Sequence, residues 1–457
     1  MGKKKGKKDT NGNTDFDFNK ALESLKEVSI GAAASGTTIE TREGLGRVLV
    51  ATKVFKTGDI VLQESPFCVF ENSWIGLALE YSKMTAAEKE KLMEFQHISS
   101  VEEARHPEFI LNTLATFTEL LCLPEVRQLM ETKGIDENDA FKLCTIVAIN
   151  AHMYIGHTSY EVSTSITPHR GALFYIASKM SHSCNPNCCY TSKQIHGELV
   201  YFATRPILCG DLLTFSYIES TYSPTSQRRA DLMRSKDFFC LCEKCCAPDW
   251  AESYPCAMGA CREGITCPTV MAANTPSEWS CILCRSATSP STERSDKAYA
   301  WFKAVEKMLV TPTLHEEVSQ VIGQIKPFIS PVNHKLIEMY IWLSSIYATD
   351  AHCWKKFGNQ NKWLQSVISS TSALLRAIAM IECLDSKCTA GANCTIEHPP
   401  LHSLCHFVLW VCMDFIETRR AIPKQVQKYL MFLEMIYGCD DEDICKIKLA
   451  CNHKSKR

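Results

Sequence analysis

Hydrophobic and polar positions follow two different periods along the chain, and the change of period separates strand-like from helical stretches. From Ile39 to Phe70, short apolar runs such as Val48-Leu49-Val50 and Ile60-Val61-Leu62 are separated by turn residues, which is typical of short strands. Strand-like runs return from Ala172 to Tyr217. The pattern therefore predicts a β-rich unit whose strands come from two separated parts of the sequence.

The stretch between these two parts, residues 71–150, follows a helical pattern. Thr85-x-x-Glu88 is a capping box that opens a charged helix, because each side chain bonds the backbone amide of the other residue. A second helical stretch covers Phe109 to Leu121 and is ended by Pro124, and a third covers Phe141 to Ile149. We therefore expect a helical insertion within the β-rich unit.

The last third of the chain is helical. Apolar residues recur at the 3.6-residue period in three stretches: Leu336, Met339, Tyr340, Leu343, Ile346 and Tyr347; Leu404, Phe407, Val408, Val411 and Phe415; and Val426, Tyr429, Leu430, Leu433 and Ile436 between Pro423 and Gly438. Several amphipathic helices with short links predict an antiparallel helical domain over residues 291–457. We find no clean internal repeat, so a strict repeat array is not expected.

Charge and composition narrow the classes of function. The formal charge of −2, from 49 Lys and Arg against 51 Asp and Glu, does not favour nucleic-acid binding by bulk charge. No apolar run reaches the about 18 residues of a membrane span. Residues 1–37 form a polar tail and lead-in whose basic start has no apolar segment after it, so it is not a secretory signal. We expect a solvated, disordered tail, with nuclear localisation as the alternative role.

The chain contains 25 cysteines, which need an explanation. Without a secretory signal the expected compartment is the reducing nucleus or cytoplasm, where spaced cysteines bind metal or sit in the core rather than form disulfides. Four cysteines lie in helical, apolar stretches and are expected to sit in the core: Cys353, Cys383, Cys405 and Cys412. The dense, irregular segment from Cys240 to Cys284 is the candidate metal-binding region.

Two groups of cysteines in this region have the spacing of zinc ligands. Cys240-x-Cys242-x-x-Cys245 supplies three thiolates, and a tetrahedral zinc site needs a fourth ligand. Cys246 is poorly placed beside Cys245, whereas Cys256 and the distant Cys184 are both candidates. The second group is Cys256, Cys261, Cys281 and Cys284, two close pairs separated by a loop, with Cys267 as a competing ligand.

Three motifs together resemble a known family. Ser181-His182-Ser183-Cys184-Asn185-Pro186-Asn187-Cys188 is followed by Gly210-Asp211-Leu212-Leu213-Thr214-Phe215-Ser216-Tyr217 and then by the Cys240–Cys245 group. In this order they resemble the catalytic half of SET-domain lysine methyltransferases, and most of all the arthropod branch of the SET and MYND (SMYD) family. The resemblance covers roughly residues 38–285. It favours Cys184 as the fourth zinc ligand and a zinc ribbon for the second cysteine group.

The resemblance implies an α+β fold with a definite domain order. The SET domain would cover 38–217 with its helical insertion at about 71–150, followed by a zinc-binding segment over 218–250, the ribbon over 251–290 and the helical domain. The family's MYND zinc finger is absent, because its interval contains only the widely spaced Cys68, Cys122 and Cys144.

The resemblance also assigns site residues. The methyl donor S-adenosylmethionine would contact Gly44, Leu45, Gly46, Asn150, Ser181, His182, Tyr217 and Phe238. Tyr217 would lie beside the transferred methyl group as the catalytic residue, and Phe238 would stack on adenine. Gly44-Leu45-Gly46 would also suit a plain hairpin turn, and Arg42 or Arg47 would have to supply the basic residue that the family often has there. Asn150 would also suit a helix C-cap, and Tyr217 a core position.

The implied activity is methyl transfer from S-adenosylmethionine to a protein lysine, histone or non-histone, with the peptide lying between the helical domain and the SET domain. The acceptor amine must first lose a proton, and an apolar channel helps by lowering its pKa from about 10.4. The alternative is a SET-derived scaffold that binds a protein partner with little turnover, since Ser181 stands where the family has Asn. Nucleic-acid binding is not expected, because a basic and aromatic stripe is lacking.

Overall fold

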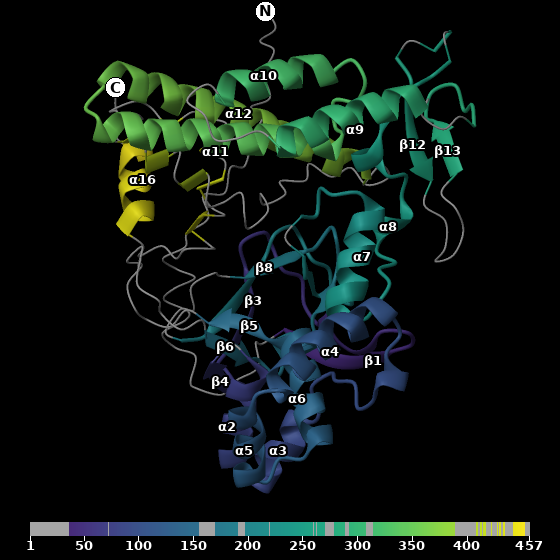
Figure 1. The fold of residues 1–457 in the computed structure, drawn as a ribbon, viewed down its shortest axis with the longest axis vertical. Helices are drawn as coiled ribbons and strands as arrows, with labels where there is room; N and C mark the ends of the chain where they lie inside the picture. Colours follow the sequence, from purple (N-terminus) through teal and green to yellow (C-terminus); the bar gives the residue numbers. More distant parts are fainter. Residues whose placement is uncertain are drawn as a thin grey trace, which may run out of the picture.

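The computed structural model describes residues 36–71, 73–154, 170–190, 197–218, 220–258, 260–261, 263–269, 278–287, 292–307, 314–388, parts of 408–434, and 442–452. Its strands form a central unit, with the insertion helices at one end and a layer of long helices at the other (Figure 1). The expected tail of residues 1–20 lies outside the described residues. The fold is α+β, as the motifs imply.

Strands from both parts of the sequence pair with one another. The first part contributes β1 (Thr37–Arg42), β2 (Gly46–Ala51), β3 (Ile60–Glu64) and β4 (Cys68–Glu71). The second contributes β5 (His152–Tyr154), β6 (Arg170–Leu173), β7 (Ser181–His182), β8 (Cys188–Tyr190), β9 (Leu199–Ala203) and β10 (Thr214–Phe215). Their orders, β3-β9-β8 and β4-β6-β5, interleave the two parts, which confirms the prediction of a single β-rich unit.

The helical insertion connects β4 to β5 and has its own hydrophobic core. Its helices are α2 (Trp74–Lys83), α3 (Ala86–Leu92), α4 (Pro107–Leu121), α5 (Pro124–Lys133) and α6 (Glu137–Asn150). The capping box at Thr85 is confirmed. Pro124 does more than end a helix, since it occupies the first turn of α5, where its missing amide hydrogen costs nothing. Helices α2 and α5 were not expected from the sequence.

After β10 come α7 (Thr225–Lys236), α8 (Glu243–Cys246) and the short helix η3 (Trp250–Glu252). The segment from Cys240 to Cys284 was expected to be irregular, and this is wrong in part. It contains a three-stranded antiparallel sheet of β11 (Tyr254–Pro255), β12 (Ile265–Thr269) and β13 (Glu278–Cys281). These strands are very short and surround a cysteine cluster, so little hydrophobic alternation marks them in the sequence.

The C-terminal layer contains α9 (Thr292–Glu306), α10 (Leu314–Ile325), α11 (His334–Lys356), α12 (Gln360–Cys388) and α16 (Glu442–Asn452). The expected buried face of α11 is confirmed at Leu336, Met339, Tyr340 and Leu343. The helices expected between Leu404 and Gly438 lie mostly outside the described residues, although Tyr429 and Leu433 are buried.

The helical layer is attached to the β-rich unit through a shared core. Val200 and Phe202 of β9 pack in the same hydrophobic cluster as the helices. The start of α11 is also hydrogen-bonded to η3, since Asn333 Nδ2 donates to Ser253 O at 2.9 Å. Of the described helices, α12 has a stretch, Gln360–Leu384, long and apolar enough to cross a membrane, and half of that stretch is buried against the protein. Burial of this kind is what a core helix requires.

Candidate functional site

Two short strands, whose paired residues are 33 positions apart in the sequence, bring the predicted site residues together. β7 pairs in parallel with β10, so that Ser181 lies opposite Thr214 and His182 opposite Phe215. The side chain of Asn187 fixes this crossing from the side. Its Nδ2 donates to Leu212 O at 2.8 Å, and its Oδ1 accepts from Thr214 N at 2.8 Å. The two motifs read in the sequence are therefore one structural unit.

Tyr217 is held at both ends just beyond β10. Its backbone amide donates to His182 Nδ1 at 3.0 Å, and its hydroxyl donates to Met180 O at 2.5 Å. Its ring lies 5.2 Å from that of His182 and edge-on to Phe238 at 6.1 Å, between centroids. Burial raises the pKa of the Tyr217 hydroxyl above its ordinary value, so the group stays protonated at neutral pH.

The tautomer of His182 follows from its two partners. Because Nδ1 accepts the Tyr217 amide hydrogen, the ring hydrogen of neutral His182 is on Nε2, which lies 3.2 Å from Cys184 Sγ. Burial lowers the pKa of His182 to about 4, which keeps the ring neutral at physiological pH. One imidazole thus connects the predicted catalytic tyrosine to the predicted metal ligand Cys184.

Phe238 completes the aromatic surroundings of the site. Its ring centroid lies 5.8 Å from that of His182. Tyr217, His182 and Phe238 are all only partly buried, so ring surface remains available to a bound molecule. The structure therefore brings together three of the residues predicted to contact S-adenosylmethionine, together with Ser181 in β7.

The glycines of the first hairpin connect β1 to β2. Gly44 and Gly46 both have positive φ, of 75° and 72°, where a side chain is disfavoured, and the side chain of Leu45 between them is 55 % exposed. The hairpin is tied to the β10 motif, since Leu213 N donates to Leu49 O at 2.9 Å. Cofactor contact by Gly44, Leu45 and Gly46 stays a prediction.

The two arginines considered for this loop already have partners. Arg42 Nη2 donates to Gly210 O at 3.0 Å, and Arg47 forms an ion pair of 3.0 Å with Glu94. Both side chains stay partly exposed, so a role for either arginine at the hairpin stays a prediction.

Asn150 is the last residue of α6, and the helix cap is Ala151 rather than Asn150. Its side-chain nitrogen donates to Gln96 O at 2.8 Å and to Ile146 O at 3.0 Å. Both amide hydrogens are engaged, so a contact with a cofactor falls to the side-chain oxygen. The role of Asn150 in binding the methyl donor stays a prediction.

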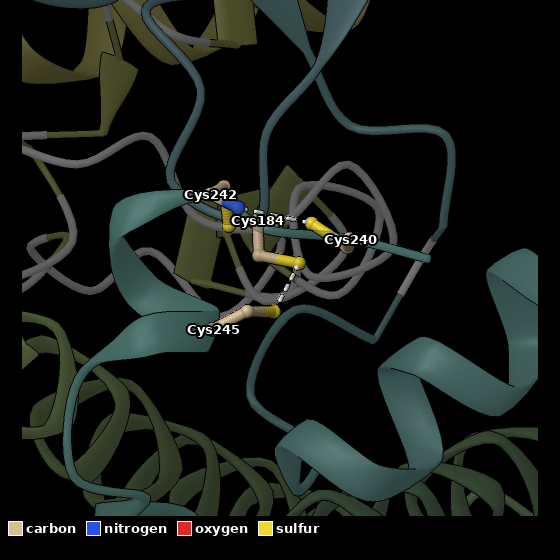
Figure 2. A group of neighbouring side chains, drawn as sticks. All are labelled: Cys184, Cys240, Cys242 and Cys245. Carbon is tan, nitrogen blue, oxygen red and sulfur yellow. Dashed lines mark hydrogen bonds between the residues drawn. The ribbon is translucent and has the colours of Figure 1, made fainter. Parts of the chain in front are cut away.

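Cys184, Cys240, Cys242 and Cys245 gather into one cluster (Figure 2). Their sulfurs lie within 4.8 Å of one another, and those of Cys184 and Cys245 are 3.5 Å apart. Tetrahedral zinc with bonds of about 2.3 Å separates its sulfur ligands by roughly 3.8 Å, so the four thiols fit such an ion. Of the candidates for the fourth ligand, the structure selects Cys184 and leaves Cys246 outside the group.

Two buried arginines of α7 surround this cluster. Arg228 is 1 % exposed, and its Nη2 donates to Thr225 Oγ1 at 2.9 Å and to Cys245 Sγ at 3.4 Å. Arg229 donates to the backbone oxygens of Cys240 and Cys245 at 3.0 and 3.1 Å. Buried arginine costs free energy unless it is paired, and four thiolates around a divalent metal would carry the compensating negative charge. No sequence pattern points to Arg228, because its partner is known only from the fold.

The second cluster consists of Cys256, Cys261, Cys281 and Cys284. The sulfurs of Cys256 and Cys284 are 3.8 Å apart, and so are those of Cys261 and Cys281. The competing ligand Cys267 lies within β12 and is not one of the four. Both cysteine clusters could therefore hold a metal ion of the zinc type.

A buried aromatic group adjoins Tyr217 and was not anticipated from the sequence. Phe215 lies 4.8 Å from Tyr217 and 5.8 Å from His152, between ring centroids. His152 also hydrogen-bonds to the Tyr201 hydroxyl at 3.0 Å, and burial, with a smaller contribution from the charge of Lys236, lowers the pKa of His152 to about 4. These residues come from different strands, so only pairing brings them together.

Comparison with known proteins agrees with this arrangement. Residues 46–218 match the family model of the SET domain. The chain is 24% identical over 258 residues to the SET domain-containing protein SmydA-8, isoform B, of Drosophila melanogaster, covering 54% of each chain. It is 28% identical over 126 residues to the histone-lysine N-methyltransferase set5 of Schizosaccharomyces pombe, covering 26% of this chain and 38% of that one.

The chain thus spans about half the length, or less, of these two relatives. Among solved structures, that of Rubisco LSMT bound to AdoMet aligns with 96% of this chain and 91% of the other, at 12% identity and a TM-score of 0.30. A score of that size does not establish a shared fold by itself. The interlocked motifs and the match to the family model show that residues 46–218 of this chain form a SET domain.

Proposed function

We propose that this protein is an S-adenosylmethionine-dependent protein-lysine N-methyltransferase. The observation that carries the proposal is the Tyr217 hydroxyl, anchored on Met180 O between the neutral ring of His182 and the edge of Phe238. The SET-domain match and the naming of the fission-yeast relative as a histone-lysine N-methyltransferase support it.

S-adenosylmethionine would supply a methyl group made electrophilic by the neighbouring sulfonium. The residues that would hold it are Tyr217, His182, Phe238 and Ser181, with Gly44, Leu45, Gly46 and Asn150 as the further predicted contacts. The partly exposed aromatic rings offer the faces on which a purine stacks. These side chains therefore offer the aromatic surfaces that the adenine of the donor would contact.

The chain's own groups perform three tasks in the transfer. The Tyr217 hydroxyl donates its hydrogen bond to Met180 O, so the lone pairs of its oxygen can face an electron-poor methyl group. The aromatic residues beside it, Phe215 and His152, exclude water and lower the pKa of an acceptor amine by desolvation. Holding the donor and the acceptor in fixed positions then accounts for most of the rate acceleration, because methyl transfer is an in-line displacement that depends on alignment.

We propose a protein lysine as the acceptor, on histone or non-histone proteins, in the nucleus or the cytoplasm. A screen of peptide arrays with labelled S-adenosylmethionine would identify the acceptor sequence.

Calorimetry with S-adenosylmethionine tests the proposal against the scaffold alternative, which Ser181 favours. Loss of one side-chain hydrogen bond costs about 0.5–1.5 kcal/mol, so we expect binding in the micromolar range despite Ser181. Absence of binding by a correctly folded protein would leave the scaffold as the function. A Ser181→Asn variant should bind more tightly, by roughly tenfold at most.

We further propose that each cysteine cluster holds one zinc ion. Each has four thiolate ligands, which is the closed set of a structural rather than a catalytic site. The first ion would tie the loop after β7 to α8, and the second would hold the small sheet of β11, β12 and β13 together. Elemental analysis should therefore find two zinc ions per chain, one for each cluster.

Replacing Arg228 with methionine should weaken zinc retention at the first cluster. The change removes the hydrogen bond to Cys245 Sγ and the buried positive charge, and loss of such outer partners typically costs about 10–100-fold in metal affinity. The measurement is the rate of zinc release to a chromogenic chelator. Arg234→Met, at an exposed site on the same helix, is the control and should release zinc at the wild-type rate. Equal rates for the two variants would contradict the role of Arg228.

Replacing Gly264 with alanine should abolish zinc binding at the second cluster alone. A Cβ at this position would overlap the sulfurs of Cys261 and Cys281, and the ligands cannot move apart without losing their geometry. We expect zinc content to fall from two ions to one. Gly323→Ala, where an added Cβ meets nothing within 4 Å, should keep both. Two retained zinc ions in Gly264→Ala would show that the cluster can rearrange.

A further inference from the structure

Lys236, the last residue of α7, places a primary amine beside the predicted catalytic tyrosine. Its Nζ lies 6.0 Å from the centroid of the Tyr217 ring. The same nitrogen donates to Ala148 O at 2.8 Å and to Ile149 O at 2.9 Å, in the last turn of α6. The chain's own amine thus occupies the surroundings in which an acceptor lysine would have to be placed.

The backbone that carries Lys236 is fixed on its other side. Asp237 has a φ of 58°, a left-handed conformation that is uncommon outside glycine. Its carboxylate accepts hydrogen bonds of 3.0 and 2.8 Å from the amides of Arg105 and His106 at the start of α4. Phe238 follows directly, packed on His182. The turn that directs Lys236 toward Tyr217 is therefore held by the packing of α7 against α4 and α6.

The surroundings also favour a reactive amine. No ion pair of Lys236 with a carboxylate occurs in the described part of the chain, and burial lowers its pKa to about 8. A neutral amine has two N–H groups and one lone pair. The carbonyls of Ala148 and Ile149 satisfy both N–H groups, which leaves the lone pair unengaged by either of them.

Lys179, which is buried, shows what distinguishes the partly buried Lys236. Burial also lowers the pKa of Lys179 to about 8. However, its Nζ lies over the rings of Tyr175 and Phe95 and donates to Ser178 Oγ at 3.0 Å. Lys179 is also close enough to Glu94 and Glu64 to feel their charges, whereas Lys236 faces Tyr217. Lys179 is therefore an internal control for reactivity that arises from burial alone.

We propose that Lys236 is itself a methyl acceptor, modified in cis by the site that it lines. The proposal rests on the proposed function. The lone pair of neutral Lys236 Nζ attacks the methyl carbon of S-adenosylmethionine, so an N–C bond forms as the C–S bond breaks. The electron pair of that bond returns to sulfur, giving S-adenosylhomocysteine and a methylammonium cation on Lys236, and the proton that Lys236 lost before the attack has gone to water.

The two carbonyls also set the extent of modification. Monomethylated Lys236 as a cation still has two N–H groups for Ala148 O and Ile149 O. A second transfer requires the neutral secondary amine, which has only one N–H group and must give up one of these bonds. The main product is therefore monomethyllysine.

The test incubates the purified full chain, without any added substrate, with S-adenosylmethionine carrying a trideuterated methyl group. Peptide mass spectrometry, after cleavage by a protease that does not cut at lysine, should find one trideuteromethyl group on Lys236 and none on Lys179. The rate constant should not change with protein concentration, because the reaction is intramolecular. A light methyl group on Lys236 before incubation, absent from Tyr217→Phe, would equally support the proposal.

Two variants control for the fold. Lys236→Arg keeps a donor to the two carbonyls and should bind S-adenosylmethionine but gain no label in the peptide. Tyr217→Phe keeps Lys236 and should lose the label. An unmodified Lys236 in a wild-type protein that binds S-adenosylmethionine by calorimetry would overturn this proposal alone, as would a rate that rises with protein concentration. Failure to bind S-adenosylmethionine would instead overturn the proposed function, so the two failures are distinguishable.

Discussion

Tyr217→Phe is expected to lower methyl transfer by about 10²–10³-fold while the protein stays folded, as is typical when one preorganised polar group is removed from an active site. The variant keeps the ring contacts with His182, Phe215 and Phe238 and keeps the backbone hydrogen bond to His182 Nδ1. It loses only the hydroxyl, whose oxygen is oriented by its bond to Met180 O. Because the orientation of that oxygen is the proposed contribution, the loss should appear in turnover rather than in donor affinity.

The measurement is the initial rate on a peptide selected by the array screen, with donor affinity from calorimetry and stability from thermal unfolding. Tyr201→Phe is the matched control. It removes another buried hydroxyl from the same aromatic group, one bonded to His152 instead of Met180. Both variants should lose about 1–3 kcal/mol of stability, from the partner left unsatisfied, but only Tyr217→Phe should lose activity. Wild-type transfer by Tyr217→Phe would remove this residue from the mechanism.

The parts of the site that could be predicted from the sequence are those in which the cysteines lie close together along the chain. Three thiolates within six residues must lie close together in any fold, so the Cys240–Cys245 group was readable directly. The second cluster was readable for the same reason, as two close pairs. The choice of Cys184 over Cys256 as fourth ligand required the resemblance to SET domains, and in the structure Cys184 lies within the first cluster and Cys256 within the second.

Features that depend on tertiary packing could not be predicted. Lys236 reaches Tyr217 only because Asp237 turns the chain through a left-handed conformation and binds the start of α4. Arg228 has an ordinary amphipathic-helix context in the sequence, and its contact with Cys245 exists only after α7 packs on the cluster. Helix α5 was missed for a different reason, since a proline that ends one helix can equally begin the next.

Cys184→Ser should have the largest effect on stability, because Cys184 alone connects the motif strands to the later three cysteines. The other ligands lie within six residues of one another, so loss of Cys184 opens the tie between the loop after β7 and α8. Metal binding contributes on the order of 10 kcal/mol to folding in isolated zinc peptides, far above the about 0.5 kcal/mol of an ordinary surface substitution. His182 would also lose the sulfur that lies 3.2 Å from its Nε2, and with it a constraint on the ring beside Tyr217.

We therefore expect Cys184→Ser to lose one of two zinc ions, to unfold at a lower temperature and to lose binding of S-adenosylmethionine. The measurements are elemental analysis, thermal unfolding and calorimetry on the same preparation. Cys188→Ser is the matched control, because Cys188 is equally buried, lies four residues further along the chain, and is outside both cysteine clusters. It should retain both ions, so any loss from burying a serine hydroxyl is measured separately. If Cys184→Ser kept both zinc ions and bound the donor normally, the metal tie would not be what holds the donor pocket, and the crossing of β7 and β10 with Asn187 would have to hold it unaided.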